Sequence, residues 1–127
     1  MSAKPSRILV IDDNDDILFM LQAMLQLKAY QVFIKNNIED IESFIMVISP
    51  EIILMDILLG GADGHEICKR LKADPALSHI PIIMISAHSH AEAECLEAGA
   101  SYFLEKPFEI KDIYHAITYV LGREYAS

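Results

Sequence analysis

The sequence contains only two cysteines, no tryptophan and no long hydrophobic run. Cys68 and Cys95 are too few for a disulfide framework and form no CxxC pair, so we expect two free thiols that pack in the interior. No apolar run approaches the ~20 residues that cross a bilayer. The N-terminal MSAKPSRILVIDD holds an apolar stretch that is too short for a signal peptide. These absences predict a protein of the reducing cytoplasm without a membrane segment.

Basic residues are also in the minority. Ten Lys and Arg stand against 19 Asp and Glu, for a formal net charge of −9. A non-specific nucleic-acid binder needs a basic face, and an anionic membrane surface repels a protein of this charge. We therefore expect neither nucleic acid nor membrane as a partner. The apolar share of 53% argues against disorder, and 127 residues can bury the core of one domain.

Apolar runs and amphipathic stretches alternate along almost the whole chain. The short, largely β-branched runs predict strands over residues 7–11, 30–34, 52–55, 80–85 and 102–104. Helical spacing of apolar residues predicts helices over 14–27, 37–48, 64–72, 91–98 and 109–121, with Asn14 or Asp15 capping the first and Asn36 or Asn37 the second. This order is typical of α/β proteins and predicts a five-stranded, doubly wound parallel sheet with helices on both faces. We see no linker and no repeat, so residues 1–127 are expected to form a single domain.

Polar residues stand directly after four of the predicted strands. Asp12 and Asp13 follow the first, Asp56 the third, Ser86 the fourth and Lys106 the fifth. Taken singly, these would be read as helix caps, turn residues or a solvated lysine. Ligands of open α/β sheets bind at the carboxyl ends of the strands, so their joint occurrence there favours a site.

The chemistry of these groups suits a metal-assisted reaction with phosphate. Crowded carboxylates repel each other, and a cation supports their ionisation. Mg²⁺ prefers oxygen ligands, keeps several waters and takes only one or two carboxylates from a protein. One carboxylate is then free to attack phosphorus and form an aspartyl phosphate, while the metal and Lys106 neutralise the developing charge. Ser86 could donate its hydroxyl to a phosphoryl oxygen.

Four segments carry a resemblance to a known family. They are Asp12-Asp13 after ILVI, the block LMDILLGGADGHEICKRLK, Ser86-Ala87 after PIIMI, and AGASYFLEKPF. Together and in this order they resemble the receiver domains of two-component response regulators, over nearly the whole chain. The resemblance implies a flavodoxin-like fold and one receiver domain over residues 1–127, with no output domain.

The resemblance also implies a role for each site residue. The phosphoacceptor falls on Asp56. The Mg²⁺ ligands fall on Asp13, Asp56 and the backbone carbonyl of Leu58, with Asp12 acting through water. The lysine of the site falls on Lys106.

The family's switch residues fall on Ser86, which supplies the hydroxyl, and Phe103, the aromatic. The peptide bond between Lys106 and Pro107 is expected to be cis.

A receiver domain is a signalling switch that accepts a phosphoryl group from a histidine kinase or a phosphotransfer protein and then changes its binding to a downstream protein. The resemblance implies no enzymatic activity beyond Mg²⁺-dependent self-phosphorylation and slow loss of the phosphoryl group. One alternative is a degenerate receiver that serves only as an interaction module; the full acidic set and Lys106 argue against it. Another is a phosphohydrolase, but such enzymes usually carry a second acid two residues after the nucleophile, where this chain has Leu58.

Several positions depart from the family pattern or invite other interpretations. Gly60 stands where the family usually has proline, and with Gly61 it predicts a looser loop. Ser86 and Lys106 are 20 positions apart (106 − 86 = 20), about two fewer than expected, so the fourth helix or its entry should be short. His88 and His90 give only a weak metal signal. Surface positions are expected for three further histidines and two tyrosines: His65, His79, His115, Tyr114 and Tyr119.

Overall fold

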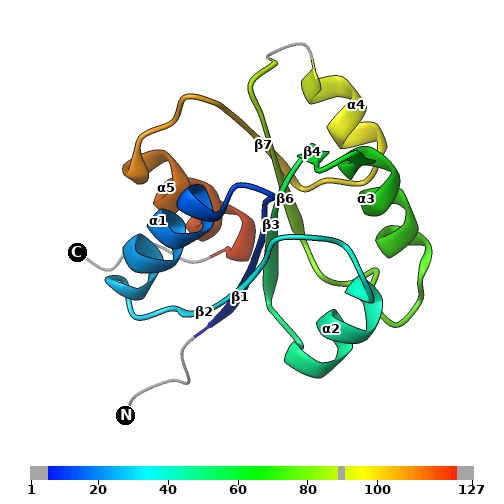
Figure 1. Ribbon diagram of the computed structural model, residues 1–127, viewed down its shortest axis with the longest axis horizontal. Coiled ribbons are helices and arrows are strands. Elements are labelled where there is room, and N and C mark those ends of the chain that lie inside the picture. The colour runs from blue at the N-terminus through cyan, green and yellow to red at the C-terminus, as the bar shows by residue number, and fades with distance from the viewer. Residues whose placement is uncertain (1–5, 89–90, 123–127) are drawn as a thin grey trace.

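A computed structural model of the chain describes residues 6–88 and 91–122. Five parallel strands form one sheet in the order β2-β1-β3-β6-β7 (Figure 1). The bounds of these strands lie within two residues of the predicted ones: β1 (Arg7–Ile11), β2 (Gln31–Lys35), β3 (Ile52–Asp56), β6 (Ile82–Ser86) and β7 (Tyr102–Glu105).

Five helices cover the two faces of this sheet, as the alternating pattern predicts. Figure 1 shows α1 (Asp15–Gln26) and α5 (Ile110–Leu121) on one face and α2 (Ile41–Ile48), α3 (Gly64–Ala73) and α4 (Glu92–Glu97) on the other. The chain moves outward from β1 to β2 and then crosses to β3 on the other side of β1. The order therefore reverses between β1 and β3, the place where doubly wound sheets hold their ligands.

The central strands are buried on both faces. Every residue of β3 and β6 is buried, because helices pack on each side of the sheet. This explains why these strands read as continuous apolar runs rather than as alternating ones. Cys68 and Cys95 are both free and buried, as predicted, and lie in the cluster under α2, α3 and α4.

The start of α2 was wrongly predicted. The helix begins at Ile41, four residues later than expected, and neither Asn36 nor Asn37 caps it. Asn37 Oδ1 accepts instead from the Glu39 backbone N–H at 2.9 Å. A short polar side chain that bonds to its own backbone two residues on favours a turn over a helix.

A small hairpin follows β3 where we expected a loose loop. Strands β4 (Leu58–Leu59) and β5 (Ala62–Asp63) pair antiparallel around Gly60 and Gly61. Both glycines have positive φ, +55° and +93°. A two-residue hairpin turn with positive φ at both positions matches the twist of its strands, so the glycines order this segment instead of loosening it.

The face of α5 is less exposed than expected. Tyr114 is half-buried and its hydroxyl donates to the Met24 carbonyl at 2.7 Å, so its predicted exposure is wrong. Tyr119 is 67% exposed, as predicted, and His79 and His115 also lie at the surface.

The stretch between β6 and β7 holds an α4 of six residues.

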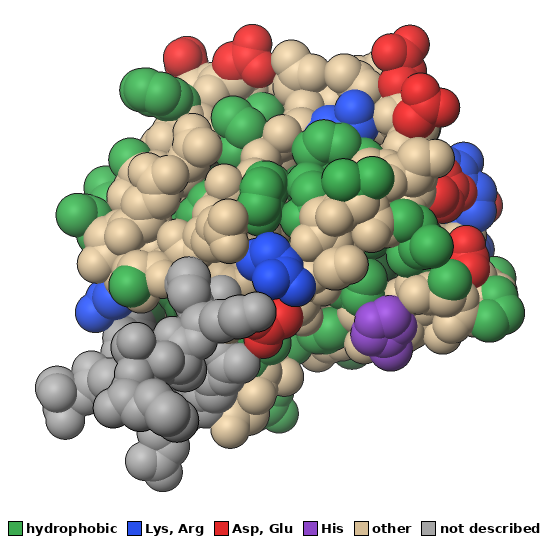
Figure 2. All heavy atoms as spheres, turned by 90° about the horizontal axis from the view of Figure 1, so that it is seen from below, with side chains coloured by type: hydrophobic (Ala, Val, Ile, Leu, Met, Phe, Trp, Pro, Cys, Tyr) green, Lys and Arg blue, Asp and Glu red, His purple; other side chains and the backbone are tan. Residues whose placement is uncertain are grey.

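Figure 2 looks at the molecule from below Figure 1, from the end at which β1 begins. On this face Lys and Arg side chains are dispersed among acidic and hydrophobic ones instead of forming one basic patch. Within residues 6–88 and 91–122, no helix is both long and apolar enough to cross a membrane.

Candidate functional site

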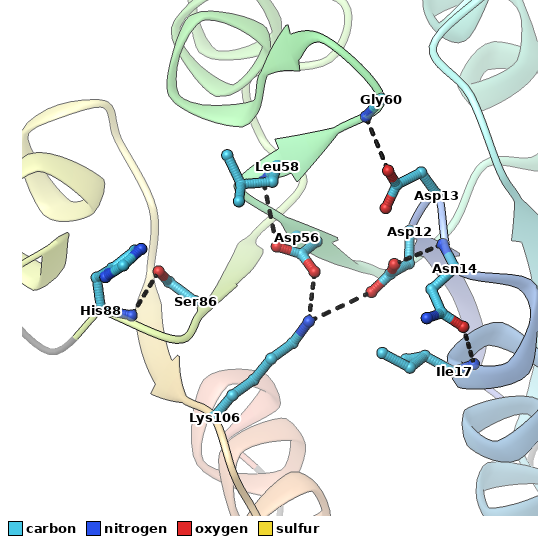
Figure 3. Close-up of polar contacts among 10 residues, drawn as sticks. All are labelled: Asp12, Asp13, Asn14, Ile17, Asp56, Leu58, Gly60, Ser86, His88 and Lys106. Carbon is cyan, nitrogen blue, oxygen red and sulfur yellow. Dashed lines mark hydrogen bonds and ion pairs between the residues drawn. The ribbon is translucent and has the colours of Figure 1, made fainter.

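The polar residues that follow the strands meet at one edge of the sheet. β1 pairs with β3, and β3 with β6, so their carboxyl ends stand side by side. The pocket between them measures about 270 Å³ and opens to solvent at this edge (Figure 3). Its lining includes six of the predicted site residues, three of their neighbours and Ile17 from α1: Asp12, Asp13, Asp56, Leu58, Ser86, Lys106, Asn14, Ala87, His88 and Ile17.

Lys106 provides the positive charge of the pocket. Its Nζ donates to Asp56 Oδ2 at 2.5 Å and lies 3.9 Å from Asp12 Oδ2 (Figure 3). Both acids are buried, with Asp56 7% and Asp12 2% exposed. The ammonium offsets the cost of holding two carboxylates close together away from water.

A backbone hydrogen bond holds the lysine loop in place. The Lys106 N–H donates to the Ser86 carbonyl at 2.7 Å, which joins the end of β6 to the residue after β7. The Lys106–Pro107 peptide bond is cis, as the resemblance implies.

Asp12 is an unusually weak acid. The pKa of its carboxyl group is raised from 3.8 to about 6, mainly by burial and in smaller part by the nearby charge of Asp56. The Asn14 backbone N–H, which donates to Asp12 Oδ1 at 2.9 Å, and the charge of Lys106 act in the opposite direction. Desolvation is the largest of these effects, so Asp12 carries an electrostatic cost at neutral pH.

The three carboxylates share the pocket but do not converge on one point. Asp56 Oδ1 accepts from the Leu58 N–H at 3.2 Å, whereas Asp13 is exposed and its Oδ2 accepts from the Gly60 N–H at 3.0 Å. Among the described side chains, no three His, Cys, Asp or Glu residues lie close enough to hold a metal ion by themselves. The donors are nevertheless all oxygens, and Mg²⁺ takes only one or two carboxylates and keeps several waters. The chemistry of the donor set therefore fits Mg²⁺.

The two predicted switch residues lie in different places. Ser86 is buried in the wall of the pocket, and its Oγ accepts from the His88 N–H at 3.0 Å. His88 is exposed at the mouth, where its place in the sequence predicts it; His90 lies outside the described residues. Phe103 is half-buried on β7 and packs against the core beneath α3 and α4, so it does not line the pocket.

The surface position predicted for His65 is also wrong. The His65 side chain is only 14% exposed, at the start of α3. Its Nδ1 lies 3.1 Å from Asp63 Oδ1, and its Nε2 lies 3.5 Å from Cys95 Sγ and 3.9 Å from Glu94 Oε2. His65 thus joins the hairpin and α3 to α4. Its neighbours on α4, Glu94 and Cys95, are 29 and 30 positions away, and no local sequence pattern predicts such a contact.

Sequence reasoning also missed the backbone donors of the site. The N–H groups of Asn14, Leu58 and Gly60 each contact one of the three aspartates. Backbone groups carry no residue-type signal, so only the conformation of the loops shows them. Of the two predicted caps of α1, Asn14 and Asp15, the structure selects Asn14, whose Oδ1 accepts from the Ile17 N–H at 3.1 Å.

Comparison with known proteins identifies the family of this chain. A family profile described as the response regulator receiver domain matches residues 8–118. The chain therefore belongs to the family of response regulator receiver domains. A solved structure described as a response regulator from Chloroflexus aurantiacus is 32% identical, with a TM-score of 0.88 over 94% of this chain and 100% of that one.

Two curated relatives are longer proteins. The response regulator PleD of Caulobacter vibrioides is 36% identical over 106 residues, which are 82% of this chain and 23% of that protein. The phosphate regulon transcriptional regulatory protein PhoB of Pseudomonas aeruginosa is 32% identical over 91% of this chain and 52% of that protein. The chain thus spans about a quarter to a half of these relatives. Because transcriptional regulators are among them, the expected absence of a nucleic-acid partner is not supported.

A further structure bears on the metal. The receiver domain of the sensor histidine kinase PA1611 from Pseudomonas aeruginosa is 25% identical, with a TM-score of 0.83 over 93% of this chain and 98% of that one. It is described with a magnesium ion coordinated in its active-site cleft. The chemotaxis response regulator CheY4 of Vibrio cholerae, 21% identical with a TM-score of 0.84 over 91% of this chain and 98% of that one, shares the flavodoxin-like fold.

Proposed function

We propose that this receiver domain is a phosphorylation-dependent switch. It accepts a phosphoryl group on Asp56 from a histidine kinase or a phosphotransfer protein, uses Mg²⁺, and then changes its binding to a downstream protein. The function is signalling and not turnover of a substrate, so the only reactions proposed are self-phosphorylation and slow loss of the phosphoryl group.

The pairing of Asp56 with Lys106 is the observation that supports this function best. A buried carboxylate at a strand end, contacted by one ammonium and open to solvent through the pocket, can be reached by a phosphoryl donor. Lys106 Nζ donates to Asp56 Oδ2, and a carboxylate oxygen of Asp56 is the nucleophile in this proposal. Lys106 then lies next to the place where negative charge grows on the phosphoryl oxygens.

In the proposed transfer, one bond to phosphorus forms and another breaks. A carboxylate oxygen of Asp56 attacks phosphorus, the bond from phosphorus to the donor imidazole nitrogen breaks, and the imidazole leaves with the electron pair. During this step Lys106 Nζ passes from Asp56 to a phosphoryl oxygen. The Leu58 N–H, already at Asp56 Oδ1, keeps the carboxyl group oriented.

Asp13, Asp56 and the Leu58 carbonyl would hold the metal, with Asp12 acting through a water. When bound, Mg²⁺ supplies positive charge for the phosphoryl oxygens and lessens the repulsion between the carboxylates. Asp12 is buried beside Asp56 and Lys106, so it contributes negative charge without being exposed to the donor.

An apolar cleft of about 340 Å³ adjoins the acidic pocket and suits the donor protein. It shares Ile17, Ala87 and Lys106 with that pocket and adds Met20 and Phe108. A donor that inserts its imidazole into the acidic pocket would cover this cleft at the same time. Burial of apolar side chains there would stabilise the encounter without adding charge at the site.

We propose that Ser86 and Phe103 transmit the phosphorylated state. Ser86 Oγ would leave the His88 N–H and donate to the phosphoryl group, which shifts a two-state equilibrium of the β6–α4 and β7–α5 units. We further propose that residues 1–127 act as one receiver in the reducing cytoplasm, where the two buried thiols stay free.

Incubation with Mg²⁺ and acetyl phosphate tests the proposed function. The protein should gain the mass of one phosphoryl group, and hydroxylamine should remove it, since an acyl phosphate reacts with that nucleophile. Asp56→Asn should stay unlabelled, while Asp16→Asn, at an exposed acid on α1, should label like the wild type. Labelling that survives Asp56→Asn would place the acceptor elsewhere, and a wild-type protein that never labels would favour an interaction module.

A further inference from the structure

The β4–β5 hairpin contacts two acidic residues of the site through its backbone (Figure 3). The Leu58 N–H donates to Asp56 Oδ1 at 3.2 Å and the Gly60 N–H donates to Asp13 Oδ2 at 3.0 Å. Asp56 ends β3, and Asp13 follows the neighbouring strand β1. The hairpin therefore connects the ends of two adjacent strands of the main sheet.

The strand geometry explains why these two N–H groups face the site. Leu58 pairs with Asp63 and Leu59 pairs with Ala62 across the hairpin. In an antiparallel pair, successive N–H groups point alternately toward the partner strand and away from it. Leu58 lies in β4 and its N–H points away from β5, and Gly60 begins the turn; the two N–H groups each donate to one of the aspartates.

Position 60 needs a residue with positive φ and a free N–H. Gly60 has φ +55°, whereas proline is held near −65° and has no N–H. A Cβ at this position would meet only the Asp13 side chain, at an ordinary contact distance of 3.8 Å. Glycine is therefore favoured at this position by its backbone conformation and its N–H, and not because a side chain would lack space. A proline, which the resemblance leads one to expect, could neither adopt this turn nor donate to Asp13.

We propose that the Gly60 N–H is a positioning donor for the magnesium site: it holds one oxygen of Asp13 and leaves the other oxygen for the metal. This inference rests on the proposed function. Asp13 is exposed, so without a partner its side chain would sample several rotamers. Carboxylates that bind metals are oriented by hydrogen bonds from outer groups, and the loss of such a bond typically weakens metal binding about 10–100-fold.

A single-atom change of the backbone tests the proposal. Semisynthesis can replace Gly60 by glycolic acid, which exchanges the N–H for an ester oxygen and adds no side chain. Titration calorimetry with MgCl₂ should show affinity about tenfold weaker than in the wild type. The same exchange at Gly61 changes the backbone of the same turn but keeps the Gly60 N–H, and its affinity should stay within about twofold. Unchanged affinity in the Gly60 ester would overturn the inference.

A second measurement uses the unmodified protein and does not depend on the folding of a variant. If Asp13 keeps its bond to Gly60 while it binds the metal, Mg²⁺ should slow hydrogen exchange of the Gly60 amide, measured by NMR. Faster exchange would mean that the metal displaces the N–H, and would overturn the inference. A wild-type protein that binds no Mg²⁺ would overturn the proposed function as well. If the wild type binds Mg²⁺ and the Gly60 ester binds it with the same affinity, only this inference is overturned.

Discussion

Asp12 is the residue with the largest electrostatic cost in the site. It is 2% exposed, lies next to Asp56, and reaches Lys106 only at 3.9 Å. Burial raises the pKa of its carboxyl group to about 6, above the value of 3.8 expected in an unfolded chain. Between these two pH values the folded protein binds more protons than the unfolded one, so stability falls as the pH rises through this window.

Asp12→Asn should stabilise the metal-free protein at neutral pH. The amide is neutral and can still accept from the Asn14 N–H, so the cost of the buried charge disappears. We expect the free energy of unfolding at pH 7.5 to rise by about 1–2 kcal/mol, and the difference to vanish below pH 4. Urea titrations in EDTA from pH 4 to 8 measure it. If the free energy of unfolding changes with pH in the same way for the two proteins, the buried charge of Asp12 is not destabilising.

At the scale of elements, the end of α1 is held in an unfavourable backbone conformation. Ala29 has φ +64°, and its N–H donates to the Gln26 carbonyl at 3.0 Å, so it closes the helix in the left-handed region. Helices usually end this way on glycine, which has no Cβ to clash with the backbone. Ala29 is exposed, so its methyl group contributes little packing.

Ala29→Gly should therefore raise the free energy of unfolding, by about 0.5–1 kcal/mol. Ala23 offers a matched control because it is exposed in the middle of the same helix. Ala23→Gly should lower stability by about 0.5–1 kcal/mol, since glycine is a poor helix former. Thermal or urea unfolding of both variants gives the comparison. If both substitutions destabilise alike, the turn at Ala29 does not determine the stability of this helix end.

At the scale of the whole molecule, acidic residues outnumber basic ones, and three of them lie where β1 and β3 end. The chain carries a net charge of −9, and Asp12, Asp13 and Asp56 share one pocket with a single ammonium, that of Lys106, within the described lining. A divalent cation that binds only the folded protein would therefore stabilise the entire domain by mass action.

Adding Mg²⁺ should raise the melting temperature. At a concentration ten times the dissociation constant, the stabilisation is about 1.4 kcal/mol, or roughly 3–6 °C for a domain of this size. Asp13→Ala should abolish the shift, which scanning calorimetry measures. Glu97→Ala removes the same charge from an exposed position on α4 and should keep it. KCl at equal ionic strength controls for screening of the net charge, and a shift retained in Asp13→Ala would contradict the site assignment.

The order of elements and the edge of the sheet that holds the site could both be predicted from the amino-acid sequence. Apolar runs that alternate with helical periodicity leave few arrangements other than a parallel sheet covered on both faces. Asp56 and Lys106 follow such runs directly, and the carboxyl ends of parallel strands share one edge, so their proximity could be predicted although they are 50 positions apart. The roles assigned to these residues stay predictions, because geometry alone does not show which reaction they carry.

The orientation of the side chains at that edge, and the distant groups that contact them, depend on tertiary packing and could not be predicted from the sequence. Asp13 turns toward the Gly60 N–H, 47 positions away, and Tyr114 finds the Met24 carbonyl at a separation of 90. His65 is covered because α4 packs beside the start of α3. Each of these contacts depends on backbone groups or on residues brought together by packing. A local sequence pattern indicates the secondary structure of its own segment, but not which residues of another segment will contact it.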